Sequence, residues 1–180
     1  MFARTKRLTL RPGWPEDARV VAQALSHDDV ATKLPRMPWP YAENTAERPT
    51  IPSTADGNWC LILAHEQATP QIVGGIGIYP AEDIGGHEIG YWLTPSAWGR
   101  GYATEAGRAM LGIARYAMGL TSLKGRYFLD NPVSGNVLRK LGFQPAGLAT
   151  LYCLARKREL PCATLELEFD EARFPTLMAA

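Results

Sequence analysis

The chain has 180 residues, of which 46% are hydrophobic and 21% are charged, and its formal net charge is +1. This balance is typical of a globular protein, and the length suits one domain, which we expect to span residues 1–180. A charge so close to zero gives no support to a basic nucleic-acid binder. We therefore expect neither nucleic acid nor a membrane surface as the main partner.

Three cysteines, at positions 60, 153 and 162, follow no metal-ligand spacing, so we expect no metal site. Their odd number favours reduced thiols over a disulfide framework. The first residues carry charge but no apolar run of the kind found in a signal peptide, and no stretch approaches the ~20 apolar residues of a membrane span. We therefore expect a cytoplasmic protein.

Hydrophobic periodicity, glycine and proline divide the chain into short elements. A strand that returns after a long helix would lie parallel to the strand before that helix, as in a βαβ unit. We therefore expect an α/β (α+β) fold with a mixed sheet. In chain order, the predicted elements are a strand (7–11), a helix (15–25), a helical turn (28–33), three strands of a meander (58–65, 71–79 and 87–93), a helix (103–118), a strand (122–129), a helix (132–141) and a hairpin (144–154 with 162–169).

A glycine-rich loop precedes the longest predicted helix. It reads Trp98-Gly99-Arg100-Gly101-Tyr102-Ala103, directly after the strand at 87–93. The first N–H groups of a helix lack partners within it, and the helix dipole adds positive charge there, so strand, loop and helix together predict an anion site. The two glycines let the main chain approach a phosphate, and Arg100 adds a full charge.

Three anionic ligands carry different loop patterns. A nucleoside triphosphate needs a lysine followed by serine or threonine after the second glycine, and that pattern is absent. A dinucleotide prefers a third glycine where this chain has Thr104, with an acidic residue about 20 positions later, which is also missing. The remaining candidate is the diphosphate of coenzyme A.

Four motifs in this order resemble the GNAT superfamily of N-acetyltransferases, and in particular the branch that acetylates the N-termini of ribosomal proteins. They are Glu-Ile-Gly-Tyr-Trp-Leu at 88–93, Trp-Gly-Arg-Gly-Tyr-Ala-Thr-Glu-Ala at 98–106, Asn-Pro-Val-Ser at 131–134 and Leu-Gly-Phe at 141–143. Trp98 departs from the glutamine or arginine that usually opens the family's loop.

The resemblance implies a mostly antiparallel sheet whose central parallel pair is splayed around acetyl-coenzyme A and flanked by helices. It also implies transfer of acetyl to a primary amine without a covalent enzyme intermediate, since no cysteine has the surroundings of a nucleophile. The residues expected to bind the cosubstrate are Trp92, Leu93, Trp98, Gly99, Arg100, Gly101, Tyr102, Ala103, Thr104, Asn131 and Asn136.

Glu88 is the candidate general base, acting through water, because it lies just before the loop and has a counterpart in the resembling branch. The alternative is a polar strand residue on the solvent face. His87 is adjacent, but the alternation of a strand places it on the opposite face, with Ile89 and Tyr91, whereas Glu88 shares its face with Trp92. His87 is therefore the second candidate.

Many members of the family protonate the departing thiolate with a tyrosine one turn before the Gly-Phe pair, where this chain has Leu138. Ser134 occupies the place of a serine that serves the leaving sulfur in the resembling branch, and we expect it to stabilise the thiolate by a hydrogen bond. Its alternative role is a helix-start hydroxyl bonded to the backbone. Asn131 has an alternative role as the N-cap before Pro132.

The energy of freeing an amine bears on the acceptor. At pH 7, deprotonating a lysine-like amine of pKa ~10.4 costs about 4.6 kcal/mol, whereas an α-amine of pKa ~7.8 costs about 1 kcal/mol. One carboxylate without a tyrosine acid suits the α-amine of a protein or peptide N-terminus. The alternatives are a small-molecule amine (a polyamine, amino acid or antibiotic) and a non-catalytic acyl-coenzyme A sensor.

The segment 34–52 contains five of the fourteen prolines and two aromatic residues, Trp39 and Tyr41. A brief helix at 43–48 fits the pattern. As a whole, the segment is either an ordinary surface loop or a wall of the acceptor pocket. The basic run at 156–158 predicts a solvated turn. The sequence leaves open whether the protein is a monomer or a homodimer.

Overall fold

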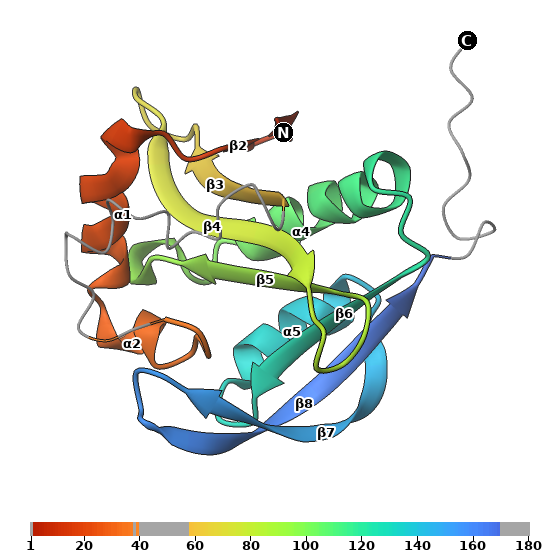
Figure 1. Ribbon diagram of the computed structural model, residues 1–180. Coiled ribbons are helices and arrows are strands. Elements are labelled where there is room, and N and C mark those ends of the chain that lie inside the picture. Colours follow the sequence, from red (N-terminus) through yellow and green to blue (C-terminus); the bar gives the residue numbers. More distant parts are fainter. Residues whose placement is uncertain (1, 38, 40–57, 170–180) are drawn as a thin grey trace, which may run out of the picture.

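The computed structural model describes residues 2–37, 39 and 58–169. Its strands form one eight-stranded sheet in the order β1-β2-β3-β4-β5-β6-β8-β7 (Figure 1). Among these described strands every neighbouring pair is antiparallel except β5 and β6, which confirms the mixed α/β fold. The strands are β1 (Ala3–Arg4), β2 (Leu8–Arg11), β3 (Asn58–Ala64), β4 (Gln71–Pro80), β5 (His87–Leu93), β6 (Ser122–Phe128), β7 (Gln144–Cys153) and β8 (Arg158–Glu168).

The parallel pair in the middle of the sheet is splayed. β5 and β6 share one paired position, Glu88 with Lys124, and the strands diverge beyond it toward their carboxyl ends (Figure 1). We call the space between residues 89–93 of β5 and residues 125–128 of β6 the wedge. Because each strand leads into a helix, the N-termini of two helices lie at this same end of the pair.

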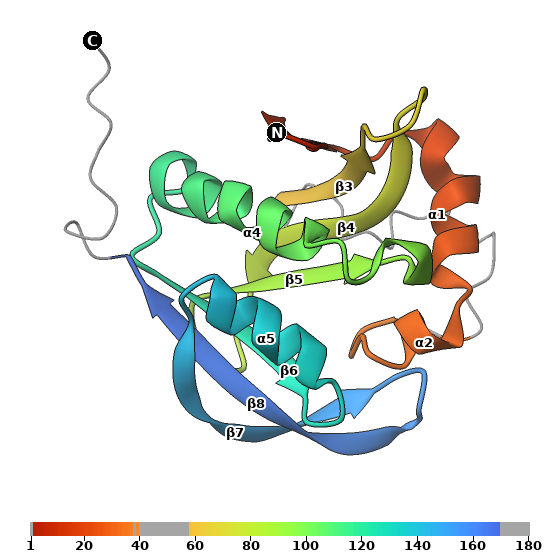
Figure 2. The ribbon, with the colours of Figure 1, turned by 180° about the vertical axis from the view of Figure 1, so that it is seen from behind.

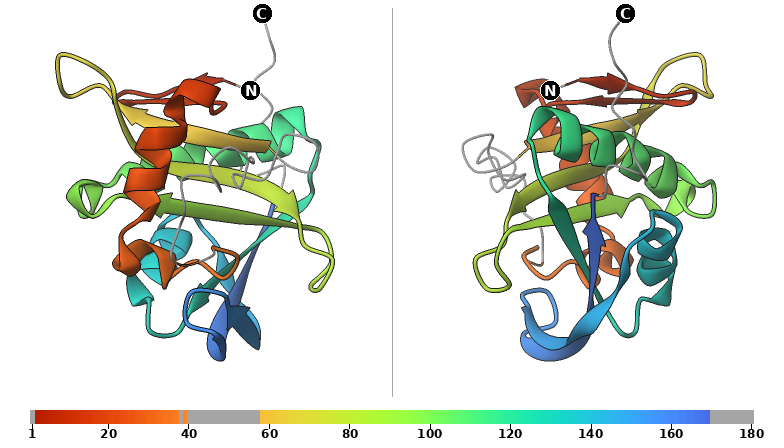
Figure 3. Two further views of the ribbon diagram at one scale, coloured as in Figure 1. Left: turned by 60° about the vertical axis from the view of Figure 1, so that its left-hand side comes forward. Right: turned by 90° about the vertical axis from the view of Figure 1, so that its right-hand side faces the viewer.

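Those two helices, α4 (Tyr102–Gly112) and α5 (Pro132–Lys140), cover one face of the sheet (Figure 2). Their buried residues join Ile76 of β4 and Ile89 of β5 in the largest apolar cluster. The other face carries α1 (Ala18–Leu25) and α2 (Asp28–Ala31), whose residues pack with Leu61 and Trp92 (Figure 3). Ile89 and Trp92 thus face opposite sides of β5, as the strand alternation predicts.

Two glycines set how closely α5 approaches β6. A Cβ on Gly125 would lie 2.7 Å from a Leu138 methyl, and one on Gly135 would lie 2.5 Å from the Tyr127 ring. Distances this short exclude any side chain without a local shift. The first turn of α5 is therefore held directly against the strand that forms one side of the wedge.

The main differences from the predicted elements lie at helix ends and in the last strand, predicted at 162–169, which begins four residues earlier as β8. The helix predicted at 15–25 begins as a 3-10 turn, η1 (Pro15–Asp17), and α4 continues into a π-helical turn, η3 (Ile113–Ala117). The two-residue β1 is too short to leave a periodic pattern. The predicted helix at 43–48 and most of the segment 34–52 lie outside the described residues. No helix within the described ranges has the length and apolar character needed to cross a membrane.

Candidate active site

The loop between β5 and α4 has the backbone that its glycines predict. After a short 3-10 turn, η2 (Pro95–Ala97), Gly99 and Gly101 adopt φ angles of 75° and 78°, in the left-handed region that side-chain-bearing residues rarely occupy. Gly101 is the N-cap of α4, and its carbonyl accepts the N–H of Glu105 at 3.1 Å. The preceding amides, which include those of Ala103 and Thr104, are left at the open end of the helix. This arrangement fits a diphosphate.

The Trp98 side chain stabilises the glycine loop by a hydrogen bond to the end of β5. Its indole Nε1 donates to the carbonyl of Leu93 at 2.9 Å, while about half of its surface stays exposed. This hydrogen bond joins the last residue of β5 to the first residue of the glycine loop. Two of the predicted cosubstrate residues are thereby brought together.

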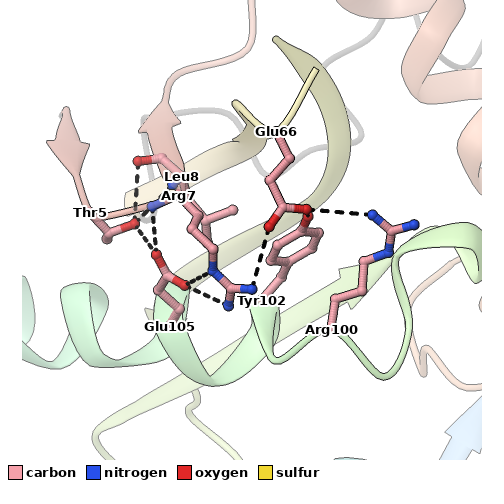
Figure 4. A network of polar contacts seen from close by, with 7 residues as sticks. All are labelled: Thr5, Arg7, Leu8, Glu66, Arg100, Tyr102 and Glu105. Atoms are coloured by element: carbon pink, nitrogen blue, oxygen red, sulfur yellow. Dashed lines mark hydrogen bonds and ion pairs between the residues drawn. The ribbon is translucent and has the colours of Figure 1, made fainter.

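A partly buried polar network joins the start of α4 to the turn between β1 and β2 (Figure 4). The Glu105 carboxylate accepts hydrogen bonds from the Thr5 hydroxyl at 2.6 Å and from the Arg7 main chain at 2.9 Å, and it pairs with the Arg7 guanidinium at 2.7 Å. Burial raises the pKa of Glu105, but these hydrogen bonds and the Arg7 charge outweigh it and hold the pKa below its usual value. The negative charge in the first turn of α4 is therefore neutralised.

On the same side, Arg100 and Tyr102 both turn toward Glu66, on the turn between β3 and β4 (Figure 4). The Tyr102 hydroxyl donates to Glu66, and Arg100 lies 3.5 Å from the same carboxylate with 55% of its side chain exposed. Tyr102 is thus a buried support of the loop. Arg100 lies at the predicted position, but its charge already has a partner.

The two asparagines predicted to contact the cosubstrate lie at the start and on the exposed side of α5. Asn131 occupies the N-cap position without a side-chain cap hydrogen bond, and Asn136 Oδ1 accepts from Arg139 at 2.6 Å on the exposed side of the helix. Their contacts to the cosubstrate stay predictions.

A cavity of about 780 Å³ lies on the opposite face of the sheet, beside the end of α1 and the residues that follow α2. Five aromatic residues line it together with aliphatic residues of the 25–37 segment and of β7, and it reaches Gly90 and Tyr91 beside the wedge. The aromatic residues are Trp59, Tyr79, Tyr91, Trp92 and Tyr152. Trp92, predicted to bind the cosubstrate, therefore presents its side chain to this cavity and to α1.

Glu88 lies in the wall of this cavity and is ion-paired. Its Oε2 accepts hydrogen bonds from Arg126 Nη2 at 2.6 Å and Nε at 3.2 Å, and the two side chains are 6% and 4% exposed. Arg126 also donates to Asp83. Burial lowers the pKa of Arg126, but its bonds to both carboxylates and their charges raise it above its usual value. The alternative that places Glu88 on a solvent face is wrong.

His87 does not share this environment. It is the first residue of β5, opposite Pro80, and it is not among the residues that line the cavity. In the described part of the chain, no group of three or more histidine, cysteine, aspartate or glutamate side chains could hold a metal ion.

On the helix-covered face, the Tyr91 hydroxyl reaches across the wedge to Ser134. It lies 2.9 Å from Ser134 Oγ and 2.9 Å from the Ser134 carbonyl, to which it donates. Ser134 is therefore bonded to a phenol, whereas the sequence offered a backbone partner as its alternative. Leu138, at the position of the usual tyrosine, is buried against Gly125. The sequence analysis missed Tyr91 as a functional candidate.

Ion pairs and a main-chain hydrogen bond fix the position of the segment after α2, which supplies part of the cavity lining. The Leu154 amide donates to the Pro35 carbonyl at 3.0 Å, and Asp130 pairs with both Lys33 and Arg156. The segment after α2 is thereby joined to the β7–β8 hairpin. The prediction of a solvated basic turn is wrong for Arg156, which is largely buried against Phe128.

Comparison with known proteins agrees with this geometry. The family model for the acetyltransferase (GNAT) domain matches residues 7–144. An uncharacterised N-acetyltransferase, p20, of Bacillus licheniformis is 30% identical over 161 residues, which cover 86% of this chain and 88% of that protein.

Solved structures share the fold. A GNAT-family acetyltransferase from Bacillus anthracis superposes with a TM-score of 0.76 at 20% identity, covering 93% of this chain and 98% of that one. RimL, a ribosomal L7/L12 alpha-N-protein acetyltransferase in complex with coenzyme A, superposes with a TM-score of 0.72 at 16% identity, covering 91% and 97%.

The chain belongs to the GNAT acetyltransferase family. It is an acetyl-coenzyme A-dependent N-acetyltransferase, which confirms the resemblance seen in the sequence and the predicted cosubstrate.

Proposed function

We propose that this enzyme transfers acetyl to the α-amine of a protein or peptide N-terminus. The observation that carries the proposal is the buried, ion-paired Glu88 in the wall of an aromatic cavity that reaches the wedge. The cosubstrate supplies a reactive thioester, so positioning and proton handling by the chain provide the rest.

In this proposal the cosubstrate lies in the wedge with its diphosphate at the N-terminus of α4. The loop glycines give the main chain the required curvature, and the first-turn amides provide the donors. The acceptor enters from the opposite face through the aromatic cavity. The two substrates then meet beside Gly90 and Tyr91, where the cavity adjoins the diverging strands.

Glu88 is the proposed general base, directly or through one water. Arg126 occupies its Oε2 with two N–H donors, and among the described residues no hydrogen bond reaches Oε1. Arg126 thus fixes the carboxylate in one orientation and leaves one oxygen for an incoming N–H. A single carboxylate held in this way suits an amine that is already partly neutral at pH 7, which favours an α-amine over a lysine side chain.

The cavity itself favours a second candidate, a small-molecule amine. Its volume of about 780 Å³ lies within the range of pockets that enclose small ligands. An aromatic or aliphatic amine would be enclosed there, whereas a peptide would place only its first one or two side chains inside.

Thiol release from acetyl-coenzyme A in the presence of candidate acceptors tests the proposal. Each peptide contains an internal lysine and is assayed with a free and with an acetylated N-terminus. The panel also includes a polyamine, amino acids and an aminoglycoside. Turnover with free N-termini supports the proposal, whereas turnover with only small amines supports the second candidate. Tight coenzyme A binding without any stimulated release indicates a sensor.

Glu88→Gln tests the role of the carboxylate. We expect unchanged coenzyme A affinity by calorimetry and turnover lower by about 10²-fold at pH 7, the lower range for general-base catalysis. Glu159→Gln, at an exposed position of β8, is the matched control and should leave both values unchanged. Normal turnover in Glu88→Gln removes Glu88 from the mechanism.

We further propose that residues 1–180 work as one catalytic domain in the cytoplasm. All described strands share one sheet, and the three cysteines are buried with no disulfide between them, which suits a reducing compartment.

A further inference from the structure

The departing thiolate needs a hydrogen-bond donor, and α5 offers none at the usual place. Leu138 is fully apolar, and its methyl groups fill the space above Gly125. Ser134, one turn earlier, has a hydroxyl group, but a lone serine is a poor acid. Its value as a donor depends on where its single proton points.

Tyr91 supplies the missing phenol from a strand. It lies in the part of β5 that has diverged from β6, and its side chain crosses the wedge to the first turn of α5. The hydroxyl is 2.9 Å from Ser134 Oγ, and it has a second acceptor at the same distance in the Ser134 carbonyl. Two hydroxyls and one carbonyl therefore share two protons.

These protons have two arrangements. If the phenol donates to the carbonyl, its oxygen accepts the Ser134 proton in the arrangement that satisfies both hydroxyls, and only lone pairs of Ser134 Oγ then face the wedge. If the phenol donates to Ser134 Oγ, the serine proton is free to point outward. Negative charge in the wedge favours the second arrangement, and a chain of aligned hydroxyls polarises each successive donor.

We propose that Tyr91 is a positioning residue: by donating to Ser134 Oγ, it aims the serine hydroxyl at the sulfur of coenzyme A and strengthens it as a donor to the thiolate. The amine nitrogen bonds to the thioester carbon, the carbon–sulfur bond breaks with its electron pair on sulfur, and the thiolate is stabilised by the Ser134 O–H without a full proton transfer. The proton lost by the amine goes to the base, and solvent protonates the thiolate after release.

The surroundings of Tyr91 keep the phenol protonated for this role. Burial raises the pKa of Tyr91, opposed only by the hydrogen bond with Ser134, and no charged side chain in the described structure contributes. A neutral donor that does not ionise at physiological pH is what a relay without net proton loss requires.

The test follows the ionisation of coenzyme A bound to the full-length enzyme, using the ultraviolet absorbance of the thiolate against pH. In the unaltered enzyme we expect the bound thiol to titrate below free coenzyme A. In Tyr91→Phe, which keeps the ring, the acid dissociation constant of the bound thiol should fall about tenfold, as expected for the loss of one hydrogen bond to a charged group, so the thiolate fraction falls by that factor at any pH well below the pKa of the thiol. The protein's own cysteines are buried, and the same titration without coenzyme A corrects for them.

Substitutions at Ser134 show whether Tyr91 acts through it. Ser134→Ala should produce the same loss, and Tyr91→Phe should add nothing in that background. Ser134→Thr, which keeps a hydroxyl, should retain most of the thiolate. In turnover, Tyr91→Phe should lower kcat by a similar factor and leave KM for acetyl-coenzyme A unchanged.

Tyr127→Phe is the matched control, because its hydroxyl also contacts α5 but at Arg139, 3.5 Å away. It should not change the titration of the bound thiol. The inference rests on the proposed position of coenzyme A. Calorimetry tests that position separately, because a protein that does not bind coenzyme A overturns it. Normal binding with the same thiol titration in Tyr91→Phe and the unaltered enzyme overturns the role of Tyr91.

Discussion

Replacing Arg126 with methionine tests how strongly the fold depends on the charge pair in the cavity wall. The Arg126 and Glu88 side chains are 4% and 6% exposed, so the substitution leaves a buried carboxylate without its counter-charge. Removing one partner of such a pair costs about 3–5 kcal/mol. Asp83 is half exposed and water hydrates it when the arginine is removed, so losing its ion pair with Arg126 adds little to the loss of stability. For a chain of this size the loss corresponds to a fall in Tm of roughly 6–20 °C.

The measurement is urea unfolding at pH 7, followed by the fluorescence of the five tryptophans. The double variant Glu88→Gln/Arg126→Met removes both charges and should recover at least half of the lost stability, because no buried charge remains. Arg158→Met, at an exposed position, should change the free energy of unfolding by less than about 0.5 kcal/mol. A cost below about 1 kcal/mol for Arg126→Met, or a double variant no more stable than the single, would refute the reasoning.

Three further substitutions follow from the structure. Gly101→Ala forces a side chain into a φ of 78°, so we expect unfolding to become easier by about 1–2 kcal/mol and coenzyme A to bind more weakly in calorimetry; an unchanged affinity would contradict the loop assignment. Glu105→Gln should cost about 2 kcal/mol at pH 7. Because the folded pKa of Glu105 is lowered, this cost is present above the unfolded pKa and should vanish as the pH falls through the folded pKa; a pH-independent cost in unfolding titrations would argue against the ion pair. Leu138→Ala should cost about 2–5 kcal/mol in the same unfolding assay, and a smaller value would show that α5 does not pack on β6 as closely as described.

Most of the fold could be predicted from local patterns. The strand at 87–93 has the predicted bounds, and the helix at 132–141 ends one residue early, because alternation and helical periodicity record which side of each element is buried. The alternation of β5 also separated Glu88 and Trp92 from Ile89 and Tyr91. The apolar clusters confirm that division for Ile89 and Trp92.

The partners of the site residues could not be predicted. Arg126 lies 38 positions from Glu88, and Ser134 lies 43 positions from Tyr91. Each pairing depends on how β5 is aligned against β6. The two strands share only one paired position, Glu88 with Lys124, and no local sequence pattern encodes that alignment. β6 carries a second basic residue, Lys124, so the charge of Arg126 within the strand gave no distinctive signal.

The sheet separates two duties of the proposed mechanism by placing them on opposite faces. Residues 98–104, which are proposed to hold the cosubstrate, belong to the side of α4 and α5, whereas residues 25–37 and β7 supply the part of the cavity wall that lies outside the central strands. Selectivity for the amine can therefore diverge among relatives while the shared donor stays the same. Exchanging the segment 25–37 between such enzymes should transfer the preference for an acceptor amine and leave the cosubstrate loop unchanged.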